Sequence, residues 1–385
     1  MNFNLTDDQQ AFVDTAKAFA DKELAPFAAE WDETAHFPIE VFRKAGELGF
    51  MGMYTPEHAG GFGMSRLDAA LIFEQLAMGC TATTAMMTIH NMVSWMIGAF
   101  ATPQVAEQWV PDLVMGSKLG SYCLTEPGAG SDAASLRTSA RRDGDEYVLN
   151  GAKMFISGAG STDVLVVMAR TGGPGPRGIS AFVVPADANG IHYGKKEAKM
   201  GWNAQPTRLV TFEDVRIPAA NLLGDEGEGF KFAMMGLDGG RINIAVCSVG
   251  TAQAALNTAR NYMRERQQFG KPLAQFQALE FKLADMATEL VAARQMVRLA
   301  AFKVDHDDAD KTTYCAMAKR FATDVGFTVC NEALQIHGGY GYIKEYPLER
   351  HVRDVRVHQI LEGTNEIMRV IIGRRLLADM DREIL

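Results

Sequence analysis

Cysteine and metal-ligand patterns are scarce in this sequence. Its five cysteines are Cys80, Cys123, Cys247, Cys315 and Cys330, and none of them belongs to a C-x-x-C pair. An odd number of scattered cysteines does not suggest a disulfide framework, and no spacing fits a zinc site. We therefore expect small core residues in a reducing compartment and no bound metal.

Long hydrophobic runs are missing as well. The most apolar window, residues 83–100, is interrupted by His90 and Asn91, and it is too short and too polar to span a bilayer. The N-terminal segment MNFNLTDDQQAFVDTAKAFA has early acids and no basic run before an apolar stretch, unlike a secretory signal or a transit peptide. The sequence predicts a soluble, cytoplasmic and bacterial protein without a membrane partner. A processed protein of the mitochondrial matrix is the minor alternative.

Positive charge is in short supply. The 385 residues carry a net charge of −9, which argues against a nucleic-acid partner because such a partner needs a basic face. Hydrophobic residues make up 47%, too many for a disordered chain. The length suits two or three domains around a large core, and the chain contains no internal repeat or low-complexity segment.

The chain changes character twice. From residue 5 to about 116 the apolar pattern is helical, with Phe12 and Phe19 on one stripe, and Thr6 followed by Gln9 resembles a capping box. Short strands and turns follow, and we expect strands at 146–150, 163–169, 179–184 and 209–217. Few helices interrupt these strands, which favours a compact and mostly antiparallel barrel or sandwich.

The last part is helical again. Four long helices are expected, at 241–266, 277–306, 311–337 and 365–381. The second has little polar face, which indicates burial in a bundle or at a subunit interface. The fold class is therefore multi-domain α+β, with an N-terminal helical domain (1–120), a middle barrel or sandwich domain (121–228) and a C-terminal four-helix bundle (229–385).

One dinucleotide-like pattern is misleading. Residues 173–178, GPGPRG, match G-x-G-x-x-G, but a true motif lies between a strand and a helix. Here a strand follows and two prolines crowd the turn. A hairpin loop is the better interpretation, which disfavours a nicotinamide enzyme.

The segment YCLTEPGAGSD from Tyr122 opens the strand-rich region. Thr125 and Ser131 offer hydroxyl groups, and the glycines let backbone N–H groups approach an anion or a flavin ring. An ordinary glycine-rich turn explains the segment equally well. Phe155 could cover an aromatic ring face or pack in the core.

Two arginines adjoin glycine-containing segments. The sequence DGGR is expected to start the first bundle helix, and Arg241 could bind a phosphate or carboxylate through its planar fork, or make a surface salt bridge. Arg266, before a loop, could hold a phosphate or favour the helix C-terminus. The segment QIHGGYGY from Gln335 ends the third helix in a tight turn.

Glu362 is the candidate base. It follows two apolar residues and precedes a glycine at the start of a helix capped by Thr364 or Asn365. Apolar neighbours raise the pKa of a carboxyl group, which suits a general base. The alternative is a solvated loop glutamate.

Four segments together resemble the acyl-CoA dehydrogenase family over nearly the whole chain. They are YCLTEPGAGSD, Arg266 with the QFG that follows it, QIHGGYGY and EGTNE. The segments MGWNAQPTR, GGRINIA and VHQILEGTNEIMR are most similar to the isobutyryl-CoA dehydrogenase branch. The resemblance implies a β-barrel as the middle domain (121–228). It also implies FAD as cofactor, an acyl-CoA substrate, an electron-transferring flavoprotein as partner and a homotetramer.

The resemblance also implies roles for individual residues. The flavin would be held by Tyr122, Cys123, Leu124, Thr125, Gly130, Ser131, Phe155, Ile156 and Ser157. The ADP part, across a subunit boundary, would be held by Arg266, Phe269, Phe276, Gln277, Gln335, Ile336, His337, Gly338 and Gly339. The FAD site would be completed by Thr364, Asn365 and Glu366, and the CoA ester would contact Ser131, Asp238, Gly239, Gly240, Arg241 and Arg374.

In this family the catalytic glutamate removes the proton next to the thioester while the β-hydrogen leaves as hydride to the flavin. The isovaleryl and long-chain branches place that glutamate directly before the CoA-binding arginine, where this sequence has Gly240. The resemblance therefore implies Glu362 as the base. It favours isobutyryl-CoA, and hence valine breakdown, with a short straight-chain or 2-methylbutyryl substrate as the alternative. An acyl-CoA oxidase and a non-catalytic flavin- or CoA-binding protein are more distant alternatives.

Overall fold

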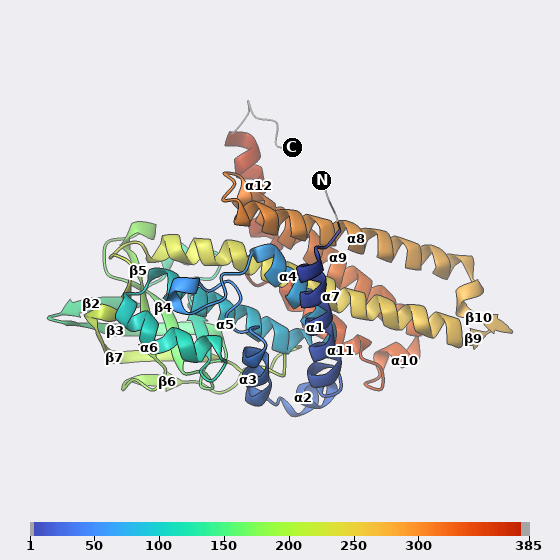
Figure 1. The fold of residues 1–385 in the computed structure, drawn as a ribbon, viewed down its shortest axis with the longest axis horizontal. Helices are drawn as coiled ribbons and strands as arrows, with labels where there is room; N and C mark the ends of the chain where they lie inside the picture. The colour runs from blue at the N-terminus through green and yellow to red at the C-terminus, as the bar shows by residue number, and fades with distance from the viewer. Residues whose placement is uncertain (1–3, 379–385) are drawn as a thin grey trace.

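The computed structural model describes residues 4–378, and the chain forms a helical part, a sheet and a second helical part (Figure 1). The first helices are α1 (Asp7–Phe19), a π-helical turn (Ala20–Leu24), α2 (Ala28–Thr34), α3 (Ile39–Glu47), α4 (Arg66–Gly79), α5 (Thr81–Phe100) and α6 (Pro103–Val114). The capping box is confirmed, because Thr6 accepts the N–H of Gln9 while the Gln9 side chain accepts that of Thr6.

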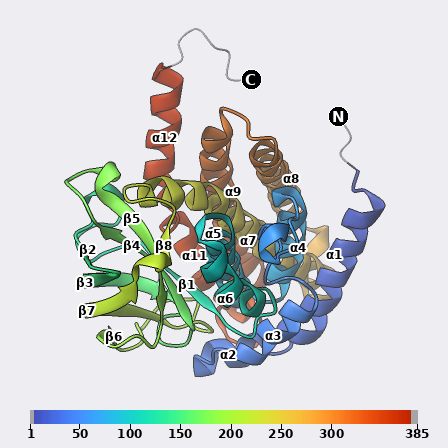
Figure 2. The same ribbon diagram turned by 60° about the vertical axis from the view of Figure 1, so that its left-hand side comes forward.

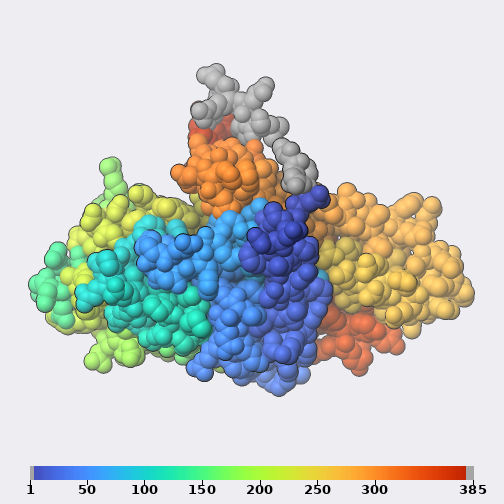
Figure 3. All heavy atoms as spheres, viewed as in Figure 1, coloured from blue at the N-terminus to red at the C-terminus, as the bar shows by residue number. Residues whose placement is uncertain are grey.

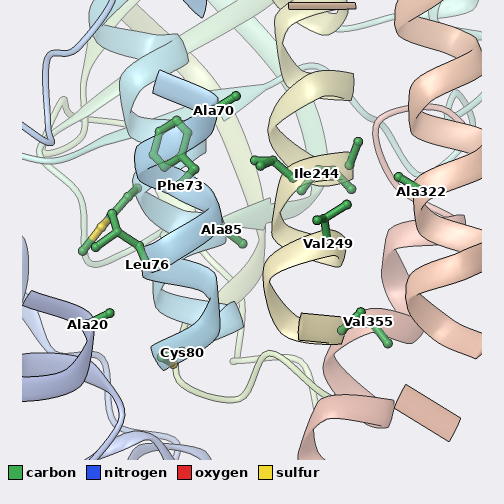
Figure 4. Packing of buried hydrophobic residues seen from close by; sticks show 14 of the residues in the cluster. Ala20, Ala70, Phe73, Leu76, Cys80, Ala85, Ile244, Val249, Ala322 and Val355 are labelled. Carbon is green, nitrogen blue, oxygen red and sulfur yellow. The ribbon is translucent and has the colours of Figure 1, made fainter. Parts of the chain in front are cut away.

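The first and last parts share one core. Ala70 of α4 points toward Ile244 and Val249 of α7 (Gly229–Glu265), and Ala85 of α5 belongs to the same core (Figure 4). These residues are buried on both sides of the contact. The helical parts therefore hold each other in place, and the site described below lies where they meet the sheet.

The sheet has eight strands. They are β1 (Gly120–Cys123), β2 (Ser139–Asp143), β3 (Glu146–Ser157), β4 (Val164–Arg170), β5 (Ile179–Pro185), β6 (Ile191–Tyr193), β7 (Thr207–Pro218) and β8 (Leu222–Leu223). The four expected strands are present as β3, β4, β5 and β7, and most pairings are antiparallel. The pattern missed the other four, which have two to five residues each and are too short for a clear alternation.

The predicted closed barrel is not confirmed. The strand order runs β6-β7-β3-β2-β4-β5-β8, with β1 added on β4, so β6 and β8 are separate edges. These edge strands have only three and two residues, which leaves too few backbone groups to close the sheet. The GPGPRG segment connects the antiparallel strands β4 and β5, as its interpretation as a hairpin loop predicts.

The last part contains the four expected long helices. They are α7, α8 (Gln277–Asp305), α9 (Lys311–His337) and α12 (Asn365–Ala378), with α10 (Gly339–Tyr342) and α11 (Leu348–Arg356) between the last two. The expected start of α7 at residue 241 is wrong by three turns, because Gly236, Gly239 and Gly240 lie inside the helix as close-packing positions. The expected end of α12 at 381 lies outside the described residues.

The packing of α12 differs from a compact bundle. Helices α7, α8 and α9 pack against one another, whereas α12 packs mainly on α9 and projects from the rest (Figures 1 and 2). A four-helix bundle therefore stays a prediction, as do the domain limits. Helix α8 exposes Phe281, Val291, Leu299 and Phe302 on this single chain. No helix within residues 4–378 has both the length and the hydrophobicity required to cross a bilayer.

Candidate active site

Glu362 lies in the short loop between a 3-10 turn (Val357–Gln359) and α12. Its backbone is left-handed, with φ of 56°, and Gly363 follows with φ of 87°. Thr364 then caps α12 by accepting the N–H of Ile367 at 3.2 Å, so Thr364, of the two candidate caps, is the cap. The sharp turn directs the carboxylate back toward α7.

Gly240 of α7 forms the surface opposite the carboxylate. A Cβ atom built on Gly240 would lie 2.4 Å from Oε2 of Glu362 and 2.9 Å from its Cδ. The Oε2 atom is buried and has no hydrogen-bond partner within the described residues. Residue 240, directly before Arg241, thus lies against the Glu362 carboxylate. A glycine at this position leaves room for the carboxylate where it lies, and a larger residue would not.

Burial changes the proton affinity of the Glu362 carboxyl group. Desolvation raises the pKa of Glu362 from 4.5 to about 7, although the positive charges of Arg241 and Lys319 oppose the rise. The Tyr122 hydroxyl, also buried without a partner among residues 4–378, is near enough that the Glu362 charge helps raise the Tyr122 pKa, after burial itself. A carboxyl group poised near neutrality can accept a proton and later release it.

The structure places Lys319 beside Glu362, and the sequence interpretation missed this lysine. Its side chain is fully buried in α9, and Nζ donates to the carbonyl of Gly363 at 2.7 Å and to Oδ1 of Asn365 at 2.9 Å. Burial lowers the Lys319 pKa to about 8, while Glu362 opposes that change. One signal was available: Lys319 follows Cys315 by four residues and precedes Ala322 by three, so it shares their buried helix face.

The predicted flavin segments come together at the sheet. Tyr122 and Cys123 end β1, while Phe155, Ile156 and Ser157 end β3, and the N–H of Met154 donates to the carbonyl of Thr125 at 2.8 Å. Leu124 is buried, and Gly130 and Ser131 are exposed in the loop that follows.

These residues fit an aromatic cofactor. Phe155 has φ of 59° at a register shift of β3 and is 62% exposed, which is unusual for a phenylalanine beside a core strand. The partnerless Tyr122 hydroxyl adds an unused hydrogen-bonding group. An exposed ring and an unused polar group are what a bound flavin would cover.

The predicted ADP residues form a second group, elsewhere. Arg266 ends α7 and lies over the ring of Tyr340 at 5.4 Å, Phe269 is 93% exposed, and the Phe269 and Phe276 rings are 6.2 Å apart. The rest of this group, Gln277, Gln335, Ile336, His337, Gly338 and Gly339, lies at the nearby helix ends of α8, α9 and α10.

The two groups are far apart in one chain. Lys319, beside Glu362, and His337, in the second group, are 18 positions apart on α9, which corresponds to about 27 Å at 1.5 Å per residue. The space-filling view shows the loop after α7 at one end of the molecule and the sheet at the other (Figure 3). A single chain therefore does not unite the two groups.

The predicted CoA residues are mixed in accessibility. Arg241 is 5% exposed and its Nη1 donates to Asp238 at 2.6 Å, whose other oxygen accepts from Thr312. Ser131 and Arg374 are exposed. Of the residues predicted to complete the FAD site, Asn365 already makes side-chain hydrogen bonds with Lys319, Thr323 and Asp324. Glu366 is at the exposed start of α12. The described residues include no His, Cys, Asp and Glu cluster suited to a metal ion.

Arg66, Tyr54 and Asn243 form a cluster of side chains beside Gly239. A Cβ there would meet Nη2 of Arg66 at 2.5 Å, and the Arg66 guanidinium lies 3.7 Å from the ring centroid of Tyr54 and donates to Asn243 at 3.1 Å. The sequence interpretation did not identify this group, which joins α4 to α7 next to the base.

Comparison with known proteins defines the class. Residues 6–117, 121–215 and 227–377 match the N-terminal, middle and C-terminal domains of acyl-CoA dehydrogenase. The chain therefore belongs to the acyl-CoA dehydrogenase family and is an oxidoreductase. FAD is the cofactor of this family and of this chain.

Individual relatives narrow the resemblance. The mitochondrial isobutyryl-CoA dehydrogenase of Bos taurus is 55% identical over 378 residues, covering 98% of this chain and 91% of that protein. The butyryl-CoA dehydrogenase structure from Megasphaera elsdenii is 43% identical with a TM-score of 0.94, covering 98% and 100% of the two chains. A structure described as the electron transferring flavoprotein of Acidaminococcus fermentans is 42% identical with a TM-score of 0.96, at the same coverage.

Proposed function

We propose that this acyl-CoA dehydrogenase acts on a short, branched acyl-CoA, with isobutyryl-CoA favoured, and uses Glu362 as its base. The observation that carries the proposal is the buried Oε2 of Glu362, which has no partner in the described chain and faces Gly240. A carboxylate held this way can reach a substrate carbon placed between α7 and the sheet.

The chain's residues would act on the thioester in a defined order. Glu362 takes the proton from the α-carbon, and negative charge develops on the thioester oxygen. The backbone N–H of Glu362 makes no hydrogen bond to another described residue and can donate to that oxygen. Tyr122, Thr125 and Phe155 would hold the flavin ring of FAD, which when bound would supply the acceptor for the hydride that leaves the β-carbon.

The preference for a branched substrate is inferred from sequence similarity to a relative. At 55% identity over nearly the whole chain, the isobutyryl-CoA dehydrogenase relative exceeds the butyryl-CoA dehydrogenase structure at 43%. An α-branched substrate needs width beside the base rather than depth, and its product, methacrylyl-CoA, would place the enzyme in valine breakdown. A short straight-chain or 2-methylbutyryl thioester is the second candidate.

The electron-accepting partner and the oligomeric state are inferred from the same family similarity. Electrons would pass to an electron-transferring flavoprotein, which the Acidaminococcus structure supports. A homotetramer would bring the second group, around Arg266, to the flavin of another subunit. The cytoplasm, with the mitochondrial matrix as alternative, remains the expected location.

One kinetic comparison tests both parts of the proposal. With a shared electron acceptor, kcat/KM for isobutyryl-CoA or 2-methylbutyryl-CoA should exceed that for octanoyl-CoA by at least about tenfold, because an extended chain overpacks a shallow pocket. Glu362→Gln should keep FAD and bind acyl-CoA but lose turnover by several orders of magnitude. A better rate with octanoyl-CoA or butyryl-CoA overturns the branched substrate, and a variant that keeps about a tenth of the activity overturns the base.

A further inference from the structure

Lys319 is a buried cation without a carboxylate in contact. Its side chain has no exposed surface, and it makes no ion pair within 4.0 Å in the described residues. Its two acceptors are neutral, namely the carbonyl of Gly363 and the amide oxygen of Asn365. A buried ammonium group held only by neutral dipoles is costly, because a methionine would fill the same volume without losing hydration.

Both acceptors belong to the segment that carries the base. Gly363 directly follows Glu362, and Asn365 is the first residue of α12. Asn365 in turn donates to Thr323 at 2.9 Å and to Asp324 at 2.7 Å, both on α9 one turn beyond Lys319. The left-handed loop is thus attached to a rigid helix at two points on one side of the base.

The charged and titratable groups around this segment come from several elements. Those that face Glu362 are Arg241 of α7, Lys319 of α9 and Tyr122 of β1. Those that act on Lys319 are Glu362, Asp324, Arg241 and Glu366, while Lys319 itself acts on His358 in the turn before the base. The positive charges of Arg241 and Lys319 therefore oppose the rise in the Glu362 pKa that burial causes, and Lys319 also holds the Glu362 loop.

We propose that Lys319 is a positioning residue for the dehydrogenation: its ammonium group fixes the loop that aims Glu362 and stabilises the ionised carboxylate. This inference rests on the proposed role of Glu362 as the base. A lysine that only joined a loop to a helix would hold the backbone in place but would leave the proton affinity of the base unchanged.

The test is the pH profile of flavin bleaching. The FAD-loaded enzyme is mixed rapidly with isobutyryl-CoA across mildly acidic to mildly alkaline pH. In the unmodified enzyme the rate should rise with pH and level off near the Glu362 pKa of about 7, because only the carboxylate accepts a proton. In Lys319→Met the inflection should move upward by about one unit, so the rate at low pH falls roughly tenfold.

Control variants separate charge from general damage. Lys311→Met removes a lysine from the same helix that pairs with Asp307 away from the base, and it should leave the profile unchanged. Lys319→Arg keeps the charge and should keep the inflection while slowing the plateau rate. If Lys319→Met does not fold with FAD, Lys319→Gln repeats the test, since it also removes the charge.

The outcomes are distinct. An unchanged inflection in the neutral variants overturns the proposal, even if the rate falls, because a purely structural lysine gives that result. Glu362→Gln is measured in parallel. If it stays active, the proposed base is wrong; if it is inactive while the Lys319→Met inflection does not move, only the role of Lys319 is wrong.

Discussion

At the scale of single residues, the most consequential contact joins a glycine to a glutamate. Gly240 leaves space for the Glu362 carboxylate, and a Cβ atom there would lie 2.4 Å from Oε2. Neither position reveals this contact in the sequence, because only the packing of the last loop on α7 brings them together. The sequence pattern identified Glu362 and, by resemblance, Gly240, but not the distance between them.

This contact predicts the effect of one methyl group. Gly240→Ala should push the carboxylate aside and lower kcat by roughly a hundredfold, the cost of misplacing a catalytic group by about 1 Å. The matched control is Gly373→Ala on α12, where an added Cβ meets nothing within 4 Å. Steady-state kinetics on both flavin-loaded variants decides, and a Gly240→Ala enzyme with normal kcat would show that the base lies elsewhere.

At the scale of elements, the segment between β6 and β7 connects the sheet to the turn that precedes Glu362. The N–H of Trp202 donates to Asp354 of α11 at 2.6 Å, and the Trp202 ring lies edge-on to His358 at 5.4 Å. His358 precedes Glu362 by four residues and contacts Ser248 of α7 at 2.6 Å. The MGWNAQPTR segment therefore packs against the turn that precedes the Glu362 loop.

Gly201 is the tight point of this support. A Cβ atom would lie 2.5 Å from the backbone oxygen of Arg353, and backbone atoms cannot rotate away as a side chain can. Gly201→Ala should destabilise the fold by about 1–3 kcal/mol and lower the melting temperature by several degrees. Gly173→Ala, in the open hairpin loop, serves as control. Equal melting temperatures for the two variants would contradict the argument.

How well the elements could be predicted depends on what defines them. Long periodic segments such as α9 were placed correctly because their side chains alone reveal a buried face. The start of α7 was misplaced because glycines resemble helix ends until a neighbour is seen to occupy their space. Lys319 was missed for a related reason, since a lysine on a buried face does not disclose its acceptors.

At the scale of the whole molecule, a single chain separates two groups of predicted FAD residues. The Arg266 group lies at the C-terminal end of α9 and the Glu362 group lies beside Lys319, about 27 Å away along the helix axis. The barrel prediction is also not confirmed, because the sheet ends at short edge strands that no local sequence pattern reveals. Helix α8, with Phe281 and Val291 exposed, offers an apolar face to another copy.

A second copy would reunite the two groups, which predicts a link between assembly and FAD content. The enzyme should behave as a tetramer, and Arg266→Ala should lose FAD during gel filtration because a phosphate loses its positive partner. Arg141→Ala, an exposed arginine on the sheet, is the control. Light scattering and the ratio of flavin to protein absorbance measure both effects. A monomer with full FAD would contradict the prediction.

The meeting of Gly240 and Glu362 has a consequence for descent. A side chain at position 240 of the helix would occupy the same point in space as the Glu362 carboxylate of the loop. A lineage could therefore move its base from one segment to the other by replacing Gly240 with glutamate and Glu362 with glycine. The rest of the pocket would not have to change. Homologues that differ in which segment bears the acid would then be variants of one ancestral geometry.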